Sequence, residues 1–103
     1  MAAGDPADLV GDLTDPDYRL PGEEDSEGSP LLEDAQHWLQ VYAELLAFKR
    51  TLLRTAAVHK EGAPEPVVQE VSGDEALLRA ELERLERRHR FWQDRALELQ
   101  EQR

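Results

Sequence analysis

The fold is decided by the stretch between positions 31 and 53, which reads LLEDAQHWLQVYAELLAFKRTLL. One row of leucines repeats every seven residues, the spacing of a helix that packs against another helix: Leu32, Leu39, Leu46 and Leu53. A second apolar row lies one residue earlier: Leu31, Trp38, Leu45 and Leu52. Together with Tyr42, which falls between the rows, these side chains cover an arc of about 160° around a helix. The stretch therefore predicts a long helix with an unusually wide apolar face.

Local signals set the expected ends of this first helix. Ser29 can act as the N-cap and Pro30 as the first helical residue, where the missing N–H of proline costs nothing. Gly62 and Pro64 end the periodic pattern. We predict a helix over residues 30–60, followed by a linker over residues 61–72 in which Pro64 and Pro66 favour extended backbone.

A second helix is predicted over residues 73–103. Ser72 and Glu75 have the spacing of a capping box, and no helix breaker follows. Its apolar positions form a heptad row with three companions: Leu78, Leu85, Trp92 and Leu99, with Leu82, His89 and Ala96. This arc is narrower, about 100°. Most of the remaining surface is charged and includes Arg84, Arg88 and Arg95, which the pattern assigns to solvent.

Two such helices joined by a short linker predict an all-α fold, an antiparallel helical hairpin or coiled coil, with residues 30–103 as one module. The narrow apolar arc of the second helix can cover only part of the wide arc of the first. An exposed patch of that size indicates a protein-interaction surface. The predicted partner is a protein, either a second copy in a homodimer or a different helical protein. The predicted interaction residues are the apolar rows named above, Leu31, Leu32, Trp38, Leu39, Tyr42, Leu45, Leu46, Leu52, Leu53, Leu78, Leu82, Leu85, His89, Trp92 and Leu99.

Residues 1–29 form an acidic arm that the sequence predicts to be disordered. Nine of the 23 acidic residues of the chain lie in its first 30 positions, and glycine and proline are frequent there. Two short apolar islands, Leu9–Leu13 and Tyr18–Leu20, are either incidental or motifs that dock on a partner or fold back on the helices. The acidic residues serve solubility, engage a basic surface of a partner, or reach across the arginine-rich face of the second helix. Ser26 and Ser29 are candidate phosphorylation sites.

The composition argues against several classes of function. The chain of 103 residues has no cysteine, and its three histidines are too scattered for a metal site. No catalytic or phosphate-binding motif is present, so we expect no enzyme activity, no metal and no cofactor. A net charge of −11 makes nucleic acid a poor partner. No segment has the length of a membrane span or the pattern of a signal peptide, and the expected location is cytoplasmic or nucleocytoplasmic.

These observations predict a non-catalytic protein–protein interaction module, a small adaptor or complex subunit that assembles through its leucine-heptad helices. The alternative is a regulatory inhibitor whose acidic N-terminal arm binds a basic site on a partner, with the helices serving as a dimerisation element.

Overall fold

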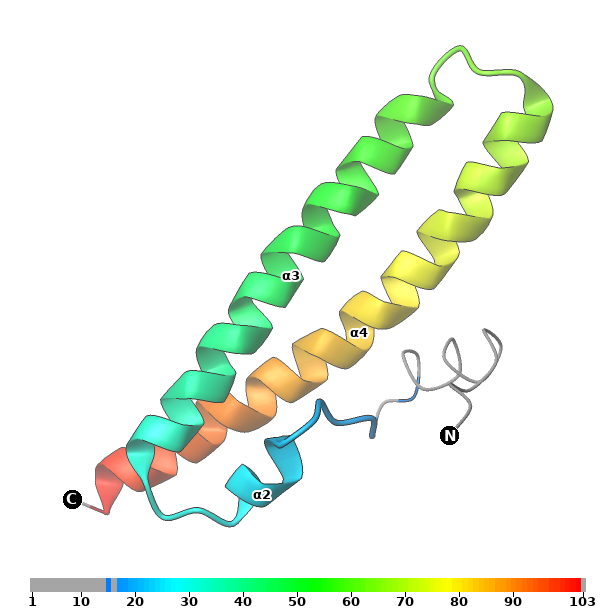
Figure 1. Ribbon diagram of the computed structural model, residues 1–103. Helices are drawn as coiled ribbons and strands as arrows, with labels where there is room; N and C mark the ends of the chain where they lie inside the picture. Colours follow the sequence, from blue (N-terminus) through cyan, green and yellow to red (C-terminus); the bar gives the residue numbers. More distant parts are fainter. Residues whose placement is uncertain (1–14, 16, 103) are drawn as a thin grey trace.

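The computed structural model describes residue 15 and residues 17–102. These residues form a short helix, α2 (Glu23–Glu27), and two long helices, α3 (Leu32–Lys60) and α4 (Glu65–Glu101). Figure 1 shows α3 and α4 side by side in opposite directions, joined by a tight turn. The predicted all-α helical hairpin is therefore confirmed. The first part of the predicted arm, residues 1–14 with the Leu9–Leu13 island, lies outside the described residues.

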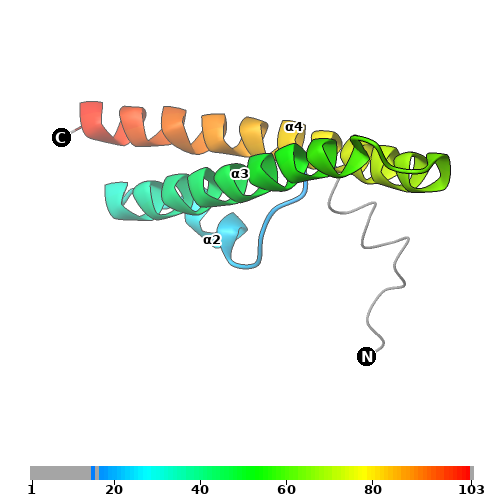
Figure 2. The ribbon, with the colours of Figure 1, turned by 90° about the horizontal axis from the view of Figure 1, so that it is seen from above.

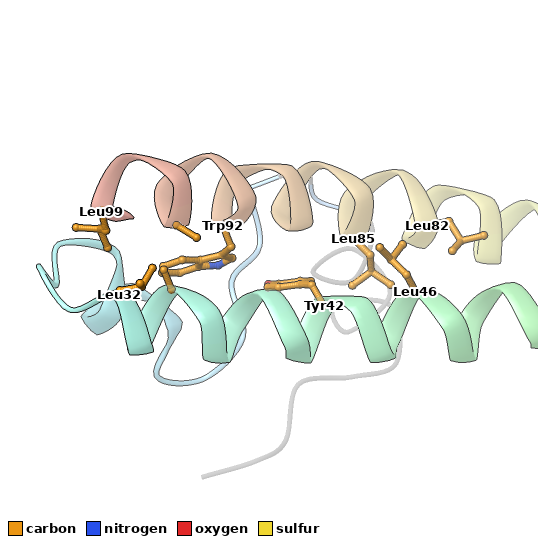
Figure 3. Packing of buried hydrophobic residues seen from close by; sticks show 9 residues of the cluster. Leu32, Tyr42, Leu46, Leu82, Leu85, Trp92 and Leu99 are labelled. Atoms are coloured by element: carbon orange, nitrogen blue, oxygen red, sulfur yellow. The ribbon is translucent and has the colours of Figure 1, made fainter. Parts of the chain in front are cut away.

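The core of the hairpin is built from the heptad rows of both helices. Opposite ends of the two helices meet, so that Leu32 lies near Leu99, as Figure 3 shows. Tyr42 and Trp92 are fully buried in the middle of this cluster. The buried apolar residues are Leu32, Ala35, Tyr42, Leu46, Leu82, Leu85, Trp92, Ala96 and Leu99. On α3, two leucines of the heptad row are thus buried together with two residues that lie between the rows, Ala35 and Tyr42, and the other leucines of that row, Leu39 and Leu53, are half-buried beside them.

The start of α3 differs from the prediction. The helix begins at Leu32, with Leu31 as an extended N-cap residue that makes no side-chain cap. Ser29 is not the N-cap, because it lies two residues before Leu31. Its hydroxyl donates to Asp34 Oδ2 at 2.6 Å and accepts from the Leu31 N–H at 3.2 Å. Ser29 thus orders the entry into the helix without belonging to it.

The predicted linker of residues 61–72 is too long, because α4 already begins at Glu65. Gly62, in the left-handed region at φ 70°, makes the turn after α3. Pro66 lies in the first turn of α4, where proline fits because that N–H would have no helical partner. The capping box at Ser72 does not form. Glu75 is instead buried and pairs with Lys60 of α3.

Ion pairs across the seam show how the two helices are aligned. Lys49 contacts Glu81 at 2.6 Å, and Arg50 contacts Glu86 at 3.4 Å. Leu46 and His89, one from each helix, line the same hollow between the helices. The heptad rows of the antiparallel pair therefore face each other along the hairpin.

Residues 17–29 form a third layer on the hairpin. Figures 1 and 2 place α2 on one face of the hairpin, toward the end where α3 starts and α4 finishes. Within this segment Glu23 is fully buried, and Leu20 packs against the core cluster. The expectation of disorder is therefore wrong for this part of the arm. We call residues 17–29 the docked segment.

Candidate functional site

A proline–glycine turn presents Glu23 to the hairpin. Gly22 has φ 85° and ψ −12°, and the Glu23 N–H donates to the Leu20 carbonyl at 3.0 Å. Pro21 followed by a glycine with positive φ is the sequence signature of a type II turn. The Leu20 N–H in turn donates to Glu23 Oε1 at 2.9 Å. The turn and the carboxylate therefore hold each other in one conformation.

The Glu23 carboxylate is the centre of the contact between the docked segment and the hairpin. Its Oε1 accepts a hydrogen bond from the Tyr42 hydroxyl at 2.5 Å. Its Oε2 accepts two from Arg88, from Nε at 2.9 Å and Nη2 at 2.6 Å, and one from Trp92 Nε1 at 2.7 Å. Tyr42 comes from α3, whereas Arg88 and Trp92 come from α4. One buried carboxylate is thus fully satisfied by both long helices.

The charge network extends outward from Arg88. Its Nη2 also contacts Glu27 Oε1 at 2.8 Å, and Glu27 accepts from Arg19 Nε at 2.9 Å. Arg88 is only 6% exposed and lies over the ring of Phe91, 4.4 Å from its centroid. Arg84, 4% exposed, lies over the ring of Tyr18 at 5.0 Å. The assignment of Arg84 and Arg88 to solvent is therefore wrong, because the docked segment covers them.

Aromatic and backbone contacts complete the surface. Trp38 and Trp92 stack with ring centroids 6.3 Å apart, and a Cβ added at Gly22 would lie 4.0 Å from Cζ2 of Trp38. Arg95 Nη2 donates to the Ser29 carbonyl at 3.0 Å. The turn at Gly22 in the docked segment therefore lies close to Trp38, a member of the second apolar row of α3.

The environment of Glu23 favours its ionised form. Burial alone raises the pKa of this carboxyl group, but the hydrogen bonds from Tyr42, Trp92, the Leu20 backbone and Arg88 outweigh burial and leave the pKa below its ordinary value. Burial and the contact with Glu23 raise the pKa of Tyr42. The pKa of Arg88 is raised because its bonds to Glu23 and Glu27 outweigh the opposing effect of burial. The neutral tyrosine and the charged arginine therefore both serve the carboxylate as donors.

This lowered pKa predicts a dependence of stability on pH. Ionised Glu23 stabilises the folded chain above the ordinary carboxyl pKa of 4.5, and the contribution disappears as the pH falls through the lowered folded-state pKa. We expect the difference in unfolding free energy between wild type and Glu23→Gln to be largest near neutral pH and to shrink in acid. Urea unfolding followed by tryptophan fluorescence measures it. A difference that stays constant down to strongly acidic pH would contradict the assignment.

The structure places the predicted interaction residues in three environments. Seven of the fifteen are buried inside the hairpin, where they belong to one apolar cluster: Leu32, Tyr42, Leu46, Leu82, Leu85, Trp92 and Leu99. Others are half-buried beside that cluster: Trp38, Leu39, Leu45, Leu53, Leu78 and His89. Leu31 and Leu52 are exposed. Contact of these rows with another protein remains a prediction, and the seven buried members are not accessible without opening the hairpin.

An apolar stripe remains uncovered on α3. Phe48 is 58% exposed and Leu52 is 37% exposed. They lie one turn apart, and the half-buried side chains of Val41 and Leu45 continue the same line. We call Val41, Leu45, Phe48 and Leu52 the α3 stripe. Phe48 was absent from the predicted interaction residues because it lies outside both heptad rows.

Other kinds of site are not found in the described part of the chain. Its histidine and carboxylate side chains do not gather in any group of three that could hold a metal ion. Over residues 17–102, no helix has the length and apolar character needed to cross a membrane.

Comparisons with models of protein families, with curated proteins and with solved structures found no match to this chain.

Proposed function

We propose that this protein is a non-catalytic protein–protein interaction module, a small adaptor or complex subunit, that binds a partner helix along the α3 stripe. The observation that carries the proposal is the exposure of Phe48 and Leu52, two large apolar side chains one turn apart on a long helix. Amphipathic helices bind through such side chains at intervals of three and four residues. The location that we propose is the one expected from the sequence, cytoplasmic or nucleocytoplasmic.

The partner is a second copy of the chain or a different helical protein. A second copy would pair the α3 stripe with itself around a twofold axis and give a four-helix assembly. A different protein would supply one amphipathic helix to the same stripe. Light scattering of the pure protein separates the two: a dimer supports the first, and a helical monomer supports the second.

The α3 stripe gives a sharper test than the core leucines. Leu52→Glu places a charge on the proposed interface, while the exposed side chain leaves the hairpin core intact. We expect circular dichroism to show unchanged helix content, and the dimer association constant or the amount of co-purified partner to fall by about tenfold or more.

The matched control is Leu97→Glu, which makes the same chemical change at a 53% exposed leucine of α4. It should leave the association unchanged. Equal binding by wild type and Leu52→Glu, with both proteins folded, would exclude the α3 stripe as the interface.

A second candidate is a regulatory inhibitor whose acidic arm binds a basic site on a partner. Glu24 and Asp25 support it, because both are exposed on α2 while Glu23 and Glu27 are engaged within the chain. Charge reversal of Glu24 and Asp25 would abolish partner binding by an inhibitor but not by an adaptor that uses the α3 stripe.

A further inference from the structure

The hairpin carries a cluster of hydrogen-bond donors that converge on one point. Four donors from three side chains, Tyr42, Arg88 and Trp92, surround the position of a single carboxylate. All three side chains belong to α3 or α4, and none belongs to the docked segment. Each is buried, with Tyr42 and Trp92 at 0% exposure. The seam of the hairpin fixes Tyr42 and Trp92 in the core, so the donors are held in place for a carboxylate.

Contacts on either side of this cluster extend it into a peptide-binding surface. At one end the guanidinium of Arg84 lies over the ring of Tyr18. At the other end Arg95 binds the backbone carbonyl of Ser29. Between them Arg88 holds a second carboxylate, that of Glu27. Three arginines along α4 therefore contact an aromatic ring, two glutamate carboxylates and a backbone carbonyl of the docked segment.

The docked segment occupies this surface as an intramolecular ligand. Its only regular element, α2, has five residues, which is far below the length at which a helix is stable by itself. Its order therefore comes from its contacts with the hairpin. Pro30 and Leu31 join it to α3, and it contributes no residue to the buried apolar cluster of the two long helices, against which its Leu20 packs. Docking is thus a binding equilibrium in which the tether supplies a high effective concentration.

We infer that Tyr42, Arg88 and Trp92 form a binding site for a glutamate-bearing acidic segment of a partner protein, and that residues 18–27 are the resident ligand which that segment displaces. Charge complementarity defines the ligand: a buried arginine and two neutral donors direct their hydrogen bonds to a carboxylate. Two copies that exchanged their docked segments would form the same contacts as before, and their association would cost translational and rotational entropy. Since a second copy of the segment would gain nothing over the resident one, the occupant that we propose is a segment of a different protein. This inference does not depend on the α3 stripe.

The test uses full-length Glu23→Ala and a fluorescent peptide of residues 17–30 as the probe. Loss of the Glu23 carboxylate weakens the resident ligand and leaves all the hairpin donors in place. We expect the peptide to bind Glu23→Ala at least about tenfold more tightly than wild type. A matched peptide with glutamine at position 23 should bind at least about tenfold more weakly. Tyr42→Phe, added to Glu23→Ala, should weaken the natural peptide.

A second measurement covers the case in which Glu23→Ala is not folded. Isotope-labelled wild-type protein is titrated with the unlabelled peptide, and the amide resonances of residues 18–27 should move toward those of a free segment. Equal affinity for the glutamate and glutamine peptides would overturn the inference, as would unchanged resonances at saturating peptide. A wild-type dimer that depends on Glu23 would overturn it too, since the occupant would then be a second copy.

Discussion

Replacing Glu23 with alanine will release residues 17–29 from the hairpin, at a cost to docking of about 3–5 kcal/mol. The substitution removes the acceptor for Tyr42, Arg88 and Trp92 together. A buried arginine without its carboxylate is the costly part, because its charge has been taken out of water without compensation. Undocking returns Arg88 to solvent, so the loss appears as release of the segment while the hairpin stays folded.

Limited proteolysis measures this release. Trypsin cuts after Arg19, whose guanidinium is held by Glu27 in the docked state. We expect cleavage at Arg19 to become at least about tenfold faster in Glu23→Ala, because protease attacks the open form. The matched control is Glu24→Ala, the same change at the next residue, which is exposed. Equal cleavage rates for wild type and Glu23→Ala would mean that the carboxylate does not hold the segment.

Leu85→Ala will destabilise the hairpin itself by about 2–5 kcal/mol. Leu85 is 1% exposed in the centre of the seam, where its loss leaves a cavity that the opposite helix cannot fill. A chain with so small a core has little stability to lose, and we expect partial unfolding at 25 °C. Thermal unfolding followed by circular dichroism measures the change. Leu97→Ala, the same substitution at an exposed leucine of α4, should cost less than about 0.5 kcal/mol. Similar losses at the two positions would contradict the assigned seam.

The hairpin could be predicted because its apolar residues recur at a regular spacing in the sequence. Leu32, Leu46, Leu85 and Leu99 lie in heptad rows, and a row of that kind determines which face of a helix is buried, whatever the details of the partner. The sequence also indicated two unequal apolar arcs and a need for additional cover on α3. The docked segment provides part of that cover near Trp38.

The start of α4 could not be predicted from local signals. Pro64, Pro66 and Gly73 together resemble a linker, and glycine inside a helix costs about 1 kcal/mol relative to alanine. Tertiary contacts override this preference. The helix carries Glu75 into a buried ion pair with Lys60, and Val68 and Val71 become half-buried. These contacts form only when α3 packs against α4, so the local sequence at the start of α4 does not reveal them.

The pairing of Glu23 with Arg88 could not be predicted from the sequence either. A reach of the arm across the arginines of the second helix was one of three open alternatives, and charge alone does not select one acid or one arginine. The choice is made by Tyr42 and Trp92, which the hairpin brings together from positions far apart in the chain. The one local signal was Pro21–Gly22, whose type II turn precedes Glu23 directly.

The most direct test of the docked segment is a nuclear Overhauser measurement on the full-length wild-type protein near neutral pH. The Trp92 indole N–H donates to Glu23 at 2.7 Å. We therefore expect cross-peaks between this proton and the side-chain protons of Glu23, and slow hydrogen exchange that becomes faster in Glu23→Gln. Absence of these cross-peaks, with random-coil shifts for residues 18–27 beside a folded hairpin, would show that the acidic segment is not part of the fold.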